Sequence, residues 1–155
     1  MNPDFREFFA LLLRHDVHFA VIGGVAYNHY APPRATKDID IWVEPEPKNV
    51  ARLIAAIGEF GFPIEAIDRE ALVAPDASVL MLGRVPNRID ILTHPKGLDW
   101  AVAATRRTTA SYDGVAIPII SLEDLIAAKR AAARPQDLVD VLKLERVARA
   151  TTKTT

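Results

Sequence analysis

Three aspartates on two predicted strands are the residues of this chain best placed to do chemistry. Asp38 and Asp40 stand two residues apart in an alternating Asp-Ile-Asp-Ile run, and Asp90 lies in a similar Ile-Asp-Ile run. Residues i and i+2 of a strand project from the same face, so Asp38 and Asp40 can chelate one hard cation while the isoleucines face the core. If the two strands are neighbours, Asp90 completes a site for two divalent cations.

Other acidic pairs with the same spacing lack this context. Glu44 and Glu46 alternate with prolines in a loop, and Asp68 and Glu70 fall in a predicted helix, where residues two apart do not share a face. The alternative for the strand pair is the solvated polar face of an edge strand. The third aspartate favours metal, because three carboxylates on one face repel each other unless cations lie between them.

A glycine pair and the loop after it could hold phosphate. Gly23 and Gly24 follow a short apolar strand, and a residue without Cβ lets a phosphate approach the backbone at the start of the next helix. The alternative is a tight turn that only lets the helix pack closely. Arg34 and Thr36 lie where a triphosphate held by the aspartates would extend, and the alternative is that they are ordinary polar loop residues.

Lys129 falls on the apolar stripe of a predicted helix that begins after Ser121. A lysine on an inward-facing stripe must extend to solvent or meet an anion. Phosphate is the interpretation that we favour, and a structural pairing with Asp137 or Asp140 on the following helix is its competitor.

The elements that must position these residues follow from apolar periodicity and turn signals. Helices are predicted over residues 3–14, 25–31, 48–60, 122–133 and 135–149, and strands over residues 18–22, 38–43, 78–85, 88–92, 109–112 and 115–117. Residues 64–73 and 98–105 are compatible with short helices. Turns at Pro86-Asn87 and Asp113-Gly114 predict two antiparallel pairs.

Composition indicates one globular α/β or α+β domain over residues 1–150, with residues 151–155 as a disordered tail. Lys and Arg (19) balance Asp and Glu (20), which excludes a globally basic nucleic-acid binder, and the absence of cysteine excludes disulfides and thiolate chemistry. No apolar run approaches the about 20 residues of a membrane span. We therefore expect a cytoplasmic protein with no membrane partner.

Together these residues resemble the DNA polymerase β-like nucleotidyltransferase superfamily, whose signature is a Gly-Gly or Gly-Ser turn, a strand bearing Asp-x-Asp and a third Asp on a later strand. Here these are Gly23-Gly24, Asp38 with Asp40, and Asp90. The runs GGVA and RATKDIDI, with the later LIAAK, are most similar to the small bacterial branch that contains the AbiEii-type toxins. The larger toxins carry a substantial extra domain, whereas this chain ends with two helices, so the resemblance leaves recognition of the acceptor open.

The resemblance implies a nucleotidyltransferase fold, with a mixed β-sheet, helices mainly on one side and two C-terminal helices. It further implies an NTP substrate with two Mg²⁺ or Mn²⁺ ions held by Asp38, Asp40 and Asp90, with Gly23, Gly24, Arg34, Thr36 and Lys129 around the nucleotide. The acceptor would be an RNA or protein hydroxyl, and the partner a cognate toxin or antitoxin. The alternatives are an inactive interaction module on the same fold and a nucleotidyltransferase of small molecules such as antibiotics.

Overall fold

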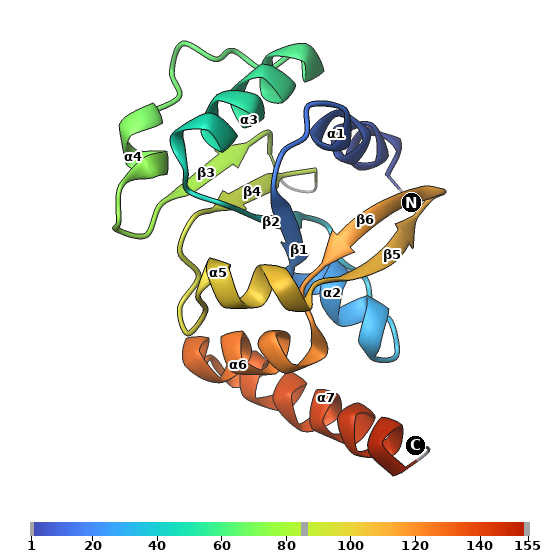
Figure 1. Ribbon diagram of the computed structural model, residues 1–155. Coiled ribbons are helices and arrows are strands. Elements are labelled where there is room, and N and C mark those ends of the chain that lie inside the picture. Colours follow the sequence, from blue (N-terminus) through green and yellow to red (C-terminus); the bar gives the residue numbers. More distant parts are fainter. Residues whose placement is uncertain (1, 85–86, 154–155) are drawn as a thin grey trace.

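One six-stranded sheet carries both aspartate-bearing strands at its centre (Figure 1). The structure is a computed structural model that describes residues 2–84 and 87–153. The strands are β1 (Phe19–Ile22), β2 (Ile39–Val43), β3 (Val79–Leu82), β4 (Ile89–Leu92), β5 (Thr108–Tyr112) and β6 (Val115–Ile119). Their spatial order is β3-β4-β2-β1-β6-β5.

Helices connect and cover these strands. They are α1 (Pro3–Arg14), α2 (Gly23–Tyr30), α3 (Pro47–Phe60), α4 (Arg69–Val73), α5 (Trp100–Ala103), α6 (Leu122–Ala132) and α7 (Pro135–Lys153), with a 3₁₀ turn η1 (Ala104–Arg106). In Figure 1, α1 and α3 lie together at one end of the molecule, and α6 and α7 lie together at the other, beside α2. Among the described residues, no helix is both long and apolar enough to cross a membrane.

The sheet is mixed, and its register sets the spacing of the carboxylates. β2 runs antiparallel to β1 and parallel to β4, and the parallel pairing places Asp40 directly opposite Asp90. Along β2 the burial alternates, because Ile39 and Ile41 are buried in the core while Asp40 between them is partly exposed. The mixed α/β architecture predicted from the sequence is confirmed.

Local sequence signals account for where several elements begin and end. Asn2 accepts a hydrogen bond from the Asp4 backbone N–H (2.8 Å) at the start of α1, and Ser121 accepts one from the Asp124 N–H (3.1 Å) at the start of α6. Gly61 ends α3 in the left-handed conformation (φ 112°). These predicted boundaries agree with the structure to within about two residues, as is usual for assigned helix ends.

Several boundaries differ from the prediction, including the end of β3, which was predicted to extend beyond Leu82. The helix predicted over residues 25–31 begins earlier, at Gly23, so that both glycines belong to the first turn of α2. The segment over residues 98–105, compatible with a short helix, forms the short α5 and η1. The disordered tail predicted from residue 151 is instead helical through Lys153, because no proline or glycine interrupts α7. The predicted turn residue Pro86, together with Val85 and residues 154–155, lies outside the described residues.

Candidate active site

The parallel pairing of β2 with β4 brings two of the three predicted carboxylates side by side. Asp40 and Asp90 are register partners, and Asp38 precedes β2 at the same end of the sheet. Burial raises the pKa of Asp40 to about 6, and the negative charges of Asp90 and Asp38 add to that shift. The three aspartates therefore interact electrostatically, and their negative charge is only partly compensated.

Arg88 supplies most of the compensation in this region. Its Nε and Nη2 donate to the two carboxylate oxygens of Asp90 at 2.8 and 3.0 Å, and Nη2 lies 3.7 Å from Asp38 Oδ2. The Arg88 backbone N–H also donates to Asp38 Oδ1 (3.2 Å). We did not identify Arg88 from the sequence, although its position two residues before Asp90 puts both side chains on one strand face.

The three aspartates have the oxygen ligands that a hard divalent cation prefers, but their side chains are not arranged around a common metal position. Within residues 2–84 and 87–153, no group of three or more His, Cys, Asp or Glu side chains is arranged to hold a metal ion. The available donors are carboxylate oxygens, which Mg²⁺ prefers, and a cation would offset the negative charges of Asp90 and Asp38 that act on Asp40. A cation bound by Asp90 would have to displace the guanidinium of Arg88.

The glycine pair borders this site through close packing. Gly23 has φ of +66°, and a Cβ at this position would overlap the carboxylate of Asp40. A Cβ on Gly24 would lie 2.6 Å from Thr36 Oγ1. Glycine is thus required at both positions, because Asp40 and the Thr36 loop pack directly on the first turn of α2.

Arg34 and Lys129 converge on a different carboxylate. The guanidinium of Arg34 forms two bonds to Asp140, at 2.5 Å from Nη1 to Oδ1 and 2.9 Å from Nη2 to Oδ2. Lys129 Nζ donates to Asp140 Oδ2 (2.8 Å) and lies 3.6 Å from Asp137 Oδ1. This is the geometry of the structural alternative for Lys129, and Arg34 binds the same carboxylate.

Thr36 contacts the segment that carries the aspartates. Its Oγ1 donates to the Asp38 carbonyl (3.1 Å) and so holds its loop against the start of β2.

Asp140 is strongly held as an anion. Burial alone would raise its pKa, but hydrogen bonds from Arg34, Lys129 and Gln136 outweigh burial and hold the pKa well below its usual range. Asp137 is paired in the same way with Arg134, whose Nε donates at 2.6 Å. Lys129 also lowers the pKa of Asp40, which indicates that this cluster lies near the aspartates of the sheet.

Comparison with known proteins identifies the fold. No protein-family profile matches the sequence, and no curated protein matches it. Among solved structures, the chain is similar to a Thermotoga maritima protein that is described provisionally as a nucleotidyltransferase. The similarity has a TM-score of 0.53 at 17% sequence identity, and it covers 97% of this chain and 88% of the other. At this identity the likeness establishes a shared fold, the nucleotidyltransferase-like mixed α/β fold that the sequence motifs predict.

Proposed function

We propose that this chain is a magnesium-dependent nucleotidyltransferase that moves a nucleoside monophosphate from an NTP to a hydroxyl of an RNA or protein acceptor. The observation that carries the proposal is the register pairing of Asp40 with Asp90, beside a helix start whose glycine packs on Asp40. The fold shared with a provisionally described nucleotidyltransferase supports the same class of reaction. The AbiEii-like branch, the toxin-antitoxin context and the cytoplasmic location are part of the proposal.

In this proposal Asp38, Asp40 and Asp90 would hold Mg²⁺ or Mn²⁺. Two such ions would neutralise the triphosphate and lower the pKa of the acceptor hydroxyl. The acceptor oxygen forms a bond to the α-phosphorus as the bond to the bridging oxygen breaks, and pyrophosphate leaves. We assign to Asp90 the role of drawing the proton from the acceptor hydroxyl.

The neighbouring residues position the nucleotide. The N-terminus of α2 presents backbone N–H groups without a side-chain cap, because Ile22 precedes the helix, and these groups suit phosphate oxygens. Thr36 braces the loop beside them through its bond to the Asp38 carbonyl. Arg34 and Lys129 are bonded to Asp140 and can reach the triphosphate only if those bonds break. We assign both residues to phosphate binding after this rearrangement.

A second candidate function follows from Arg88. Its guanidinium occupies both carboxylate oxygens of Asp90, an arrangement that would also stabilise a nucleotidyltransferase fold that has lost its metal and serves as an interaction module. In the enzyme, Mg²⁺ and nucleotide would displace the Arg88 guanidinium from Asp90. In the interaction module, Arg88 would stay bound to Asp90.

The test is whether the protein transfers a labelled nucleoside monophosphate from an NTP to an acceptor. The purified protein is incubated with each NTP labelled at the α-phosphorus, with Mg²⁺ and a cell extract, and labelled products are separated into RNA, protein and small molecules. Asp40→Asn, which keeps the size of the side chain, is the matched control. We expect label in one fraction with the wild type and none with the variant or with EDTA. Equal labelling by the variant, or none by the wild type, would favour the interaction module.

A further inference from the structure

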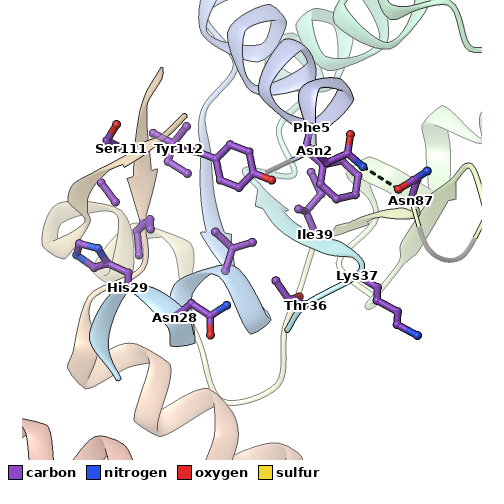
Figure 2. Close-up of a pocket in the computed structure, with 14 residues that line it drawn as sticks. Asn2, Phe5, Asn28, His29, Thr36, Lys37, Ile39, Asn87, Ser111 and Tyr112 are labelled. Carbon is purple, nitrogen blue, oxygen red and sulfur yellow. Dashed lines mark hydrogen bonds between the residues drawn. The ribbon is translucent and has the colours of Figure 1, made fainter. Parts of the chain in front are cut away.

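A cavity of about 610 Å³ lies beside the segment that leads into β2 (Figure 2). It is bordered by the start of α1, by α2, by the segment leading into β2 and by the β5–β6 hairpin, and it is partly open to solvent. Its volume falls within the range of about 300 to 1,000 Å³ that is typical of small-molecule sites.

The lining of this cavity includes residues next to the carboxylates but not the carboxylates themselves. Thr36, Lys37 and Ile39 line the cavity, whereas Asp38 and Asp40 do not. Asn87 also lines the cavity, while the next residue, Arg88, binds Asp90. The cavity therefore borders the two segments that carry Asp38 and Arg88.

The interior of the cavity is apolar and partly aromatic. Ile39, Ile117 and Ile119 are buried in the core and form part of its lining, together with Phe5 from α1. In Figure 2 the Tyr112 ring projects into the same space from the hairpin. Such a lining would take the body of a flat apolar molecule.

Among the described residues that line the cavity, Lys37 carries a positive charge and none is an aspartate or glutamate. Lys37 is exposed, and in Figure 2 its side chain extends away from the Tyr112 ring, so its ammonium group can meet an anion at the edge of the cavity. The amide of Asn87 already accepts a bond from Asn2 (2.7 Å, dashed in Figure 2), which leaves its N–H groups to donate. A ligand that meets these groups must supply acceptor oxygens.

We propose that this cavity binds a small molecule with a flat apolar body and an anionic head group, with the body against the isoleucines and the head group beside Lys37. The cavity adjoins the proposed nucleotide site, because Thr36 lines it, but the proposal does not rest on that function being correct.

The test uses two fluorescent probes that share one body. Anilinonaphthalene sulfonate carries an anionic group, and phenylnaphthylamine is its neutral counterpart. We expect the sulfonate to bind the folded protein at one site and more tightly than the neutral probe. Near-ultraviolet circular dichroism of each sample checks that binding is to the native state, because partly folded states also bind such probes.

Variants from opposite walls locate the probe. Ala110→Phe from β5 and Val25→Phe from α2 each add a ring to the cavity lining, and we expect each to weaken both probes about tenfold or more by steric exclusion. Ala116→Phe is the matched control, because Ala116 is exposed and is not part of that lining. The two blocking variants guard against a single variant that fails to fold.

Lys37→Met tests the head group. We expect it to weaken the sulfonate about two- to fivefold, as befits one exposed ion pair, and to leave the neutral probe unchanged. Asp40→Asn should bind both probes as the wild type does, which would distinguish this cavity from the carboxylate site. Absence of binding by the wild type, equal binding of both probes, or wild-type binding by both blocking variants would overturn the proposal.

Discussion

Two acidic clusters lie near each other in this molecule, and their charges are balanced in opposite ways. The guanidinium of Arg88 contacts Asp90 and Asp38, and burial together with the neighbouring carboxylates raises the pKa of Asp40 to about 6. Asp140, by contrast, receives hydrogen bonds from Arg34, Lys129 and Gln136, and its pKa is lowered. Asp40 has few such partners, so a proton or a bound cation would relieve the repulsion among the three aspartates. Asp140 has several positively charged and neutral donors, and these contacts stabilise the fold.

Asp140→Asn should produce the largest effect, because it leaves the positive charges of Arg34 and Lys129 without their buried counter-ion. Removing one partner of a buried pair costs about 3 to 5 kcal/mol, so we expect a loss of that order in the free energy of unfolding. The loss would be measured from the denaturant midpoints of the wild type and the variant, with the same denaturant dependence of the unfolding free energy used for both. Gln136→Ala removes a neutral donor from the same carboxylate and is the control. A loss below about 1 kcal/mol, the size of an exposed ion pair, would show that the cluster is not a structural anchor.

The pH dependence of stability should differ between wild type and Asp140→Asn. The folded pKa of Asp140 is depressed, so its contribution is fully present above the unfolded value of about 3.9 and is lost as the pH falls toward the folded value. We therefore expect the wild type to lose more stability than the variant as the pH falls below about 4. Thermal melts across this acidic range would measure the two slopes, and parallel slopes would contradict the assignment.

Gly23→Ala should disturb the cluster of Asp38, Asp40 and Asp90, although Gly23 is not itself a member of that cluster. The variant combines a left-handed backbone with a methyl group that overlaps the Asp40 carboxylate, and we expect a loss of about 2 to 4 kcal/mol. Gly114→Ala is the matched control, because Gly114 also has positive φ (+86°) but has nothing within 4 Å of its added Cβ. Equal losses in the two variants, measured by denaturant unfolding, would mean that Asp40 does not pack on this turn.

Lys129→Met separates the two roles of that lysine. Asp140 keeps both bonds from Arg34, so we expect a moderate loss of about 1 to 3 kcal/mol, as for one hydrogen bond to a charged group. If Lys129 also meets the triphosphate, nucleotide affinity measured by calorimetry on the folded variant falls as well. Unchanged affinity beside reduced stability would leave Lys129 as a structural residue only.

Arg88→Gln should have the smallest effect on stability and a diagnostic effect on cation binding. Arg88 is partly exposed, so we expect only a small loss of stability without metal. Because the guanidinium no longer competes for Asp90, Mn²⁺ affinity followed by electron paramagnetic resonance should rise. Weaker Mn²⁺ binding in this variant would show that Arg88 does not occupy the place of a cation.

Local signals were enough to predict most of the fold. Ser121 as a helix cap, Pro135 as a helix start and Asp113-Gly114 as a hairpin turn are decided by residues close in the chain, and the structure confirms them. The end of α7 was not predictable in this way, because Thr151 and Thr152 have weak helix propensity whereas Lys153 favours helix.

The site was predictable only in part, because its contacts join distant segments. The interpretation of Lys129 depended on whether Asp140 or a phosphate lies nearest, and only the packing of α6 on α7 places Asp140 there. Arg34 reaches Asp140 across 106 residues of sequence, a pairing that no local pattern predicts. Arg88 carries a local signal, its spacing from Asp90, but an arginine beside an expected metal ligand does not fit the pattern for a metal site.

The register of β2 with β4 also bears on when the site can form. The hydrogen bond from the Arg88 N–H to Asp38 spans 50 residues, and β1, α2 and β2 precede β4 in the chain. During synthesis, the glycine turn, Asp38 and Asp40 would thus be available long before the strand that carries Asp90. A slip of one residue in the later pairing would turn Asp90 to the opposite face. Incomplete or misregistered chains would therefore lack the three-aspartate arrangement altogether, which makes that arrangement a marker of finished folding.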